Sequence, residues 1–303
     1  MNITEFKIPH LNNKPPNFKK IQYPIPIKAN VPKPYYCSCI VGTRGTGKTY
    51  QCVKILSIQE QSGFLNPETN EKTAIRHILF TSTLGGNPIW KSLKYLSDDD
   101  IYEEYSHELL ADILEEIKTE REYTKHYNEY VKAYKIYEKM TAQQYTKWTD
   151  KDAIILLMSH DFEHYKDIEQ PRYPNGVVNN IIFDDMLASE VFSKNKSNMV
   201  LKLVLNGRHY ASNCFILSQH IKSIPKPIRE NTELWSFFPF KSRKMITEHL
   251  YELFGNLVSE DEFIVLYEYA TQDPHDSFVI DMKEDDPKNR FKKNFDKIIR
   301  ISQ

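Results

Sequence analysis

The stretch that decides the fold is GTRGTGKT at residues 42–49, which matches the pattern G-x-x-x-x-G-K-T. Glycines let a backbone curl so that successive N–H groups point at one anion. In this pattern the lysine adds a positive charge at the outer phosphates, and the hydroxyl after it suits Mg²⁺. We therefore predict a nucleotide-binding loop made of Gly42, Thr43, Arg44, Gly45, Thr46, Gly47, Lys48 and Thr49.

The segments on both sides of the loop favour the same interpretation. Residues 35–41 read YYCSCIV and predict a β-strand that enters the loop. Residues 49–59 carry Val53, Ile55 and Leu56 and predict a helix that leaves it, whose N-terminal dipole favours phosphate. The alternative is a chance glycine-rich turn, which would need neither the strand nor the helix.

Length and composition set limits on the class of protein. The 303 residues are 40% hydrophobic and 27% charged, which suits one large α/β domain or one domain with an insertion. No apolar run approaches the roughly 20 residues that span a bilayer, so we expect a soluble protein without membrane contact. The net charge is −1, so any nucleic-acid contact must come from local basic patches. Four cysteines in predicted core elements indicate buried free thiols: Cys37, Cys39, Cys52 and Cys214.

The chain is predicted to consist of an extended arm and one folded domain. Residues 1–34 are rich in proline and lysine and predict an arm without its own core. Residues 35–303 predict an α/β domain with a mostly parallel central sheet flanked by helices, because apolar strands alternate with helices. A helix is expected over residues 190–205. Further apolar elements are predicted at 75–82, 153–158, 177–183, 213–219, 234–238 and 277–281.

A helical insertion is predicted at about residues 98–148, which contain neither glycine nor proline. Its tyrosines recur every three or four residues and so share one helix face. A platform for stacking single-stranded bases is one interpretation. Packing against a neighbouring element is favoured, because packing requires this spacing and stacking does not. The tyrosines are Tyr123, Tyr127, Tyr130, Tyr134 and Tyr137.

Two acids, Asp184 and Asp185, follow the strand predicted at 177–183. An acid at the end of an apolar strand is costly unless it emerges at the carboxyl edge of the sheet, where open α/β sheets bind ligands. We predict that Asp184 coordinates Mg²⁺ directly or through its hydration shell, and that Asp185 activates water. An ordinary helix N-cap is the alternative. The phosphate loop in the same chain favours the chemical role.

Three polar residues near the next strand complete the candidate site. Gln219 ends that strand, where a neutral amide can contact the γ-phosphate or water without competing for the metal. A turn residue is nearly as good an interpretation of Gln219. Arg208 and Arg229 lie before and after the strand, and either can neutralise phosphate charge, including from a neighbouring subunit. Each alone is more often a surface salt bridge.

These motifs, in this order, resemble those of the poxvirus-type genome-packaging ATPases, a family of large double-stranded DNA viruses and virophages within the FtsK–HerA superfamily. The resemblance covers about residues 33–300. The motifs that carry it are GTRGTGKT at 42–49, VNNIIFDD at 178–185, NGRH at 206–209, LSQ at 217–219 and IPKPIREN at 224–231.

The resemblance implies a RecA-like P-loop NTPase core and a ring of identical subunits. It also implies that ATP hydrolysis, with Mg²⁺, moves double-stranded viral DNA into a preformed capsid. Capsid proteins would then be partners, and the host cytoplasm, a viral factory or the virion would be the location. The basic segments 222–244 and 288–300 would be candidates for DNA contact.

The same resemblance implies roles for single residues. Asp184 and Asp185 match the acidic pair, although many members have Asp-Glu, which leaves the role of Asp185 as direct base open. Arg208 matches the arginine that acts on the neighbouring subunit, in preference to Arg229. The residues implied in catalysis are Lys48, Asp185, Gln219 and Arg208, and those implied in metal binding are Thr49 and Asp184.

Two other functions remain open at this point. A small-molecule kinase or a GTP-binding switch also uses a phosphate loop, but the sequence contains no N-K-x-D motif to recognise guanine. An assembly protein that binds nucleotide without motor activity is the other alternative, with the tyrosine-bearing helix as its partner surface. The ordered set of motifs favours the motor over both.

Overall fold

The computed structural model of the chain describes most of the domain and little of the predicted arm. Of the residues predicted as an arm, only 23–28 and 31–34 are described, and the apolar element predicted at 153–158 lies outside the described residues. No helix within the described part is long and apolar enough to cross a membrane. The described residues are 23–28, 31–82, 88–142, 166–186, 190–192, 198–240, 242, 244, 246–255 and 257–301.

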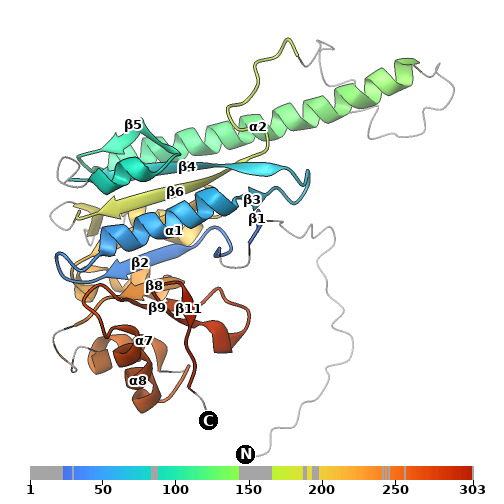
Figure 1. The fold of residues 1–303 in the computed structure, drawn as a ribbon. Coiled ribbons are helices and arrows are strands. Elements are labelled where there is room, and N and C mark those ends of the chain that lie inside the picture. The colour runs from blue at the N-terminus through green and yellow to red at the C-terminus, as the bar shows by residue number, and fades with distance from the viewer. Residues whose placement is uncertain are drawn as a thin grey trace, which may run out of the picture.

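The described strands form one eleven-stranded sheet with the order β1-β3-β4-β6-β7-β2-β8-β9-β10-β11, and β5 pairs with β4 (Figure 1). The apolar runs predicted from the sequence form most of its central strands. The strands are β1 Ile25–Pro26, β2 Cys37–Val41, β3 Phe64–Leu65, β4 Lys72–Thr81, β5 Leu96–Tyr102, β6 Val177–Asp184, β7 Ser212–Ser218, β8 Leu234–Phe237, β9 Phe278–Asp281, β10 Phe291–Lys293 and β11 Lys297–Ile298.

The sheet is mixed, which corrects the prediction of a mostly parallel one. The central strands β5, β4, β6, β7, β2 and β8 pair in parallel. The strands at both margins pair antiparallel. Antiparallel strands need only a short turn between them, as between β10 and β11, whereas parallel strands need a crossover. The α/β class itself is confirmed.

Helices cover both faces of the sheet, and alternate residues of each strand point to opposite faces. On one face lies α1 (Lys48–Ser62), as Figure 1 shows. Its apolar side chains pack with Ile40, Ile182 and Phe215. On the other face, α2 (His107–Ala142) and α4 (Met199–Asn206) pack with Ile181 and Ile216. The remaining helices of the described residues are α5 Lys226–Glu230, α7 Glu252–Phe254, α8 Glu260–Ala270, η2 Pro88–Ser92, η3 Glu190–Phe192, η4 Ile221–Ser223, η5 Ile246–Tyr251 and η6 Pro287–Asn289.

The predicted insertion begins as a strand and not as a helix. Residues 96–102 form β5, because Ile101 packs beneath the sheet and Asp100 is held by Arg76 of β4. Helix α2 begins only at His107, and residues 143–148 lie outside the described part. Of the helix predicted over 190–205, residues 193–197 lie outside the described part, residues 190–192 form the 3-10 helix η3, and α4 begins after Asn198, whose side chain accepts a hydrogen bond from the backbone N–H of Leu201.

The tyrosine stripe of α2 is packed in part. Tyr127 is only 8% exposed, whereas Tyr123 is 41% exposed and donates its hydroxyl hydrogen to the Glu169 carbonyl. Tyr130 and Tyr134 are half-buried, and the side chain of Tyr137 lies outside the described part. The buried ring of Tyr127 agrees with the packing interpretation.

Candidate nucleotide-binding site

The loop at residues 42–49 connects β2 to α1 and curls as the glycines predict. A Cβ on Gly42 would lie 2.6 Å from Thr46 Oγ1 and 2.7 Å from Phe238 Cβ, so only glycine fits there. Gly45 and Gly47 have φ of 81° and 104°, in the left-handed region that glycine adopts without steric cost. Gly47 is the N-cap residue of α1, so the free N–H groups of that helix lie in the loop.

The side chains of the loop fold back over its backbone. Thr46 donates its hydroxyl hydrogen to the Thr43 carbonyl at 2.9 Å, and Lys48 Nζ donates to the same oxygen at 3.1 Å. Burial lowers the pKa of Lys48, while the nearby carboxylates of Asp184 and Asp185 oppose that shift. The ammonium group is thus held beside the N–H groups of the loop, where a phosphate would bind.

Asp184 ends β6 and meets the loop, as predicted. Thr49 donates its hydroxyl hydrogen to Asp184 Oδ2 at 3.2 Å, although β7 separates β6 from β2 in the sheet. Asp184 is only 4% exposed, and burial raises its pKa to about 6. The charge of Asp185 raises this pKa further, whereas Thr49 and Lys48 lower it.

Trp90 is a component of the site that sequence analysis missed. It belongs to η2, and its side chain is completely buried. The indole favours the ionised form of Asp184 and so lowers its pKa, although no hydrogen bond of normal length joins its N–H to any described residue. Trp90 lies far from Asp184 in the sequence and matches no motif, so nothing in the sequence points to this contact.

Asp185 and Gln219 meet at the same edge of the sheet. Asp185 has a φ of 55°, a left-handed conformation that aspartate tolerates better than most residues. Its carbonyl accepts a hydrogen bond from Ser82 Oγ at 3.3 Å, which supports this turn. Gln219 Nε2 donates to Asp185 Oδ1 at 3.0 Å. The acidic pair, the glutamine and the loop therefore form one continuous site.

The two arginines lie elsewhere. Arg208 precedes β7, so it lies at the opposite end of the parallel strands from the loop that follows β2. There Arg208 Nη1 donates a hydrogen bond to the Tyr23 hydroxyl at 3.3 Å. Together with Glu233 and Lys283, Arg208 lines a cavity of about 970 Å³. Arg229 lies in α5 and is half-buried, and its Nε has no hydrogen-bond partner among the described residues. Neither arginine joins the site of its own subunit.

The oxygen atoms at the site suit a magnesium ion. Mg²⁺ prefers carboxylate, hydroxyl and phosphate oxygens and is bound through one or two protein groups together with substrate phosphates. Thr49 Oγ1 and the Asp184 carboxylate supply such a pair, already in contact. Among the described residues, no group of three or more His, Cys, Asp or Glu could hold a metal by itself. The donor set therefore fits Mg²⁺ that arrives with a nucleotide.

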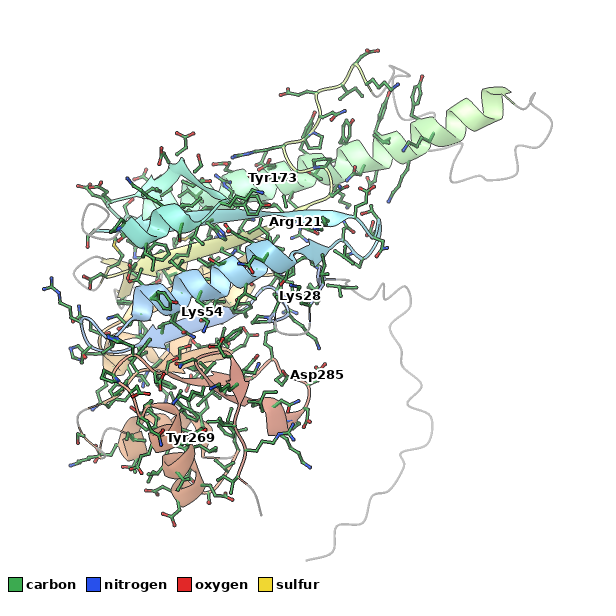
Figure 2. All side chains as sticks on the ribbon, in the orientation of Figure 1. Lys28, Lys54, Arg121, Tyr173, Tyr269 and Asp285 are labelled. Atoms are coloured by element: carbon green, nitrogen blue, oxygen red, sulfur yellow. The ribbon has the colours of Figure 1, made fainter. Side chains whose placement is uncertain are left out.

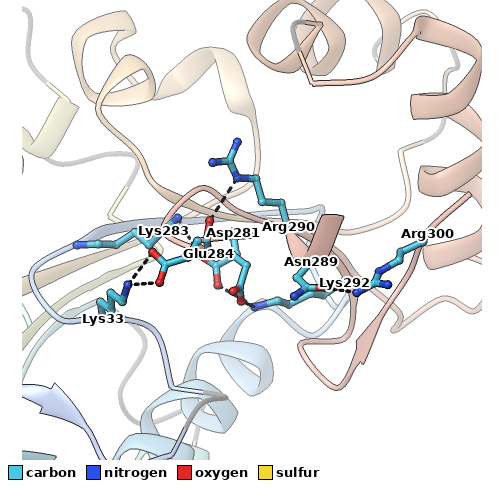
Figure 3. Close-up of polar contacts among 9 residues, drawn as sticks. Lys33, Asp281, Lys283, Glu284, Asn289, Arg290, Lys292 and Arg300 are labelled. Atoms are coloured by element: carbon cyan, nitrogen blue, oxygen red, sulfur yellow. Dashed lines mark hydrogen bonds and ion pairs between the residues drawn. The ribbon is translucent and has the colours of Figure 1, made fainter. Parts of the chain in front are cut away.

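The two basic segments differ in how many of their charges are already paired. In 288–300, Lys292 lies 2.8 Å from Asp281 and Lys293 lies 2.6 Å from Asp276. Figure 3 shows this region, including the contacts of Arg290 and Arg300 with neighbouring oxygen atoms. In the earlier segment, Lys222 and Lys226 are exposed, and Lys226 lies 3.6 Å from Glu230 in an i,i+4 ion pair.

No protein-family model and no curated protein matches the sequence. Several solved structures resemble the fold. The genome packaging NTPase B204 from Sulfolobus turreted icosahedral virus 2, in complex with AMPPCP, is 9% identical with a TM-score of 0.44, over 88% of this chain and 98% of that chain. B204 from Sulfolobus turreted icosahedral virus is 10% identical with a TM-score of 0.42, over 89% and 99%. ATPases 2 and 3 of EssC from Geobacillus thermodenitrificans are 14% identical with a TM-score of 0.39, over 70% and 34%.

Viral genome-packaging NTPases, the class that the sequence motifs resemble, are thus among the similar structures. B204 has also been solved with AMP and with ATP-gammaS.

Proposed function

We propose that this chain is a Mg²⁺-dependent ATPase that works as a DNA-packaging motor. The observation that carries the ATPase part is the 3.2 Å contact between Thr49 of the loop and Asp184 of the acidic strand. It joins a phosphate-binding loop to a carboxylate at the carboxyl edge of the sheet, where α/β proteins bind ligands. Chance placement of a glycine-rich turn would not bring these two motifs together.

Each residue of the site has a separate role in phosphoryl transfer to water. Catalysis of this reaction depends mainly on positioning and on charge stabilisation. The loop N–H groups and Lys48 bind the phosphates, and Thr49 and Asp184 hold Mg²⁺. When bound, the ion neutralises charge that develops on the phosphate oxygens. Asp185 orients and deprotonates the attacking water, and the amide of Gln219 fixes its carboxylate through the 3.0 Å hydrogen bond.

The ATPase proposal is tested by measuring phosphate release from ATP with and without Mg²⁺. Hydrolysis that requires Mg²⁺ and prefers ATP to GTP is expected. Asp185→Asn should abolish hydrolysis and retain nucleotide binding, whereas Asp112→Asn, on the outer side of α2, should change neither. If the purified chain releases no phosphate in the presence of Mg²⁺, the ATPase proposal is refuted. A strong preference for GTP would favour a GTP-binding switch, and transfer of phosphate to a nucleoside would favour a kinase.

The motor part of the proposal concerns duplex DNA and a ring of subunits. The exposed Lys222 and Lys226 follow the strand of Gln219, so phosphates of a duplex at this surface would lie near the catalytic edge. Double-stranded DNA should stimulate hydrolysis, and the stimulation should fall steeply with salt because counterions are released on binding. If the chain is a monomer and its hydrolysis rate does not change when DNA is added at low salt, the motor proposal is refuted and the ATPase proposal is unaffected.

Arg208 is proposed to act on the nucleotide of a neighbouring subunit, since it lies at the opposite end of the strands from its own loop. Arg208→Ala subunits still bind ATP and can receive the arginine of a Lys48→Ala neighbour. Mixtures of the two inactive variants should therefore recover part of the hydrolysis, measured against each variant alone. Mixtures as inactive as either parent would exclude a role for Arg208 between subunits.

A further inference from the structure

Two aromatic side chains lie beside the phosphate loop and have no role in the chemistry above. Tyr50 follows Thr49 in the first turn of α1 and is 64% exposed. His275 comes from the loop between α8 and β9, and its Nδ1 lies 3.3 Å from the Thr46 carbonyl oxygen. We propose that Tyr50 and His275 form the nucleobase-binding part of the site, an inference that rests on the proposed nucleotide-dependent function.

The loop that carries His275 is held in place by the residues that follow it. Asp276 accepts a hydrogen bond from Asn294 Nδ2 at 2.5 Å and pairs with Lys293 at 2.6 Å. The backbone N–H of Ser277 donates to Asn294 Oδ1 at 2.7 Å. His275 is therefore fixed beside the phosphate loop before any ligand arrives, which reduces the ordering cost of binding.

Tyr50 lies on the face of α1 that meets the same part of the chain. Residues four positions apart share a helix face, so Tyr50 and Lys54 lie in one row, which begins just after the N-cap residue Gly47. At one end of the row, a Cβ on Gly47 would lie 3.9 Å from His275 Nδ1. At the other end lies Lys54, which Figure 2 labels on α1. Its Nζ donates to the Asn294 carbonyl at 3.1 Å. Tyr50 is thus placed between two contacts with the C-terminal segment that positions His275.

The chemistry of this pair suits an aromatic base attached to a phosphate chain. Every nucleobase has a π-face that stacks on aromatic rings, and Tyr is a common partner. Single exposed aromatic residues are ordinary on protein surfaces. Here two of them, from segments far apart in the sequence, flank the N-terminus of α1, where the phosphates of a nucleotide would bind. The free edge of the His275 ring and the ring of Tyr50 therefore lie within reach of a base whose phosphates occupy the loop.

The test compares ATP with inorganic tripolyphosphate, which has the phosphates and lacks the base. Binding of each to the full chain in Mg²⁺ is measured by calorimetry, with competition where affinity is low. Tyr50→Ala and His275→Ala should each weaken ATP binding by about tenfold, the scale of losing one stacking partner, and leave tripolyphosphate binding within about twofold. Tyr50→Phe keeps the ring and should keep the affinity for ATP.

Matched controls come from α2, away from the loop. Tyr123→Ala and His126→Ala remove an exposed tyrosine and an exposed histidine and should change neither affinity. Equal losses for ATP and tripolyphosphate would show that the two residues act through the loop, and unchanged ATP binding would place the base elsewhere. Either result would overturn this inference and leave the proposed function unaffected. Wild-type chain that binds neither ligand would overturn the proposed function, and this inference with it.

Discussion

Two groups of charged residues lie against the sheet, one between β4, β5 and α2 and the other where β2 and β6 end. Arg76, Asp100 and Asp184 are buried, Lys48 is half-buried and Glu116 is exposed. In the first, Arg76 contacts Asp100 at 2.7 Å and Glu116 at 3.0 Å, and these partners raise the pKa of the guanidinium against the effect of burial. In the second, Lys48 donates to a backbone carbonyl, and burial lowers its pKa while raising that of Asp184.

The difference between the two groups separates a structural role from a binding role. The charges around Arg76 neutralise one another and attach β5 and α2 to β4. Lys48 and Asp184 are only partly compensated by their neighbours, so burial costs each of them free energy in the chain without ligand. A nucleotide with its cation would supply the missing partners, which is a property expected of a binding site.

The largest effect on stability is expected when the paired group is broken. Arg76→Met leaves the Asp100 carboxylate buried without its partner, which should lower the free energy of unfolding by about 3–5 kcal/mol. Urea denaturation at pH 7.5 measures this change. The double variant Arg76→Met/Asp100→Leu removes both charges and should recover a large part of the loss. If the single variant is as stable as wild type, the cluster does not attach β5 to the sheet.

In the second group, removal of the Lys48 charge should lower the rate of catalysis and hardly change the free energy of unfolding. Lys48→Ala removes the charge that stabilises the phosphates and should lower kcat by about 10²–10³-fold, or about 3–4 kcal/mol, the scale of one such donor. Urea denaturation without nucleotide should match wild type within about 1 kcal/mol, since Lys48 is only half-buried and its hydrogen bond is to a backbone carbonyl. Lys118→Ala, an exposed residue of α2, serves as the control for both measurements.

The smallest expected change is an increase in stability, caused by a substitution at Asp184. The pKa of Asp184 is about 6 in the folded chain and 3.8 without burial, so the folded state holds the extra proton between these values. The free energy of unfolding should then fall as pH rises from about 4 to about 6. Without Mg²⁺ or nucleotide, Asp184→Asn should stabilise the chain at pH 8 by about 1–3 kcal/mol while abolishing hydrolysis. A variant less stable than wild type at pH 8 would show that the carboxylate is well compensated.

The parts of the site predicted from the sequence are those that local pattern determines. The loop at 42–49 is decided by its own glycines, and Asp184, Asp185 and Gln219 are placed by the carboxyl ends of two apolar strands. Parallel pairing brings such ends to one edge, so their proximity follows once the strands are recognised. The structure brings these predicted residues together at distances of 3.0–3.2 Å.

The parts that the sequence did not predict depend on contacts between distant segments. Trp90 lies in η2 and His275 in a loop, both outside any motif, and only the folded chain brings Trp90 near Asp184 and His275 near Thr46. Most of β5 falls in the segment predicted as helical from about residue 98, because that segment contains neither glycine nor proline. The ion pair between Asp100 and Arg76 cannot be inferred from residue types alone. The direction of the strands at the margins depends on whether the chain turns back directly or crosses over between strands. The periodicity of the sequence does not determine this.

The outermost strands of the sheet have a consequence for how copies of this chain can associate. Strands β1 and β11 have two residues each, and β1 includes Pro26, which has no N–H to donate. The longer strand β5 carries two exposed acids, Asp98 and Asp99. Short, proline-bearing or charged borders discourage a second backbone from adding on. Any oligomer of this chain would then be joined by side-chain surfaces, and newly made copies would resist uncontrolled fibril-like growth before they assemble.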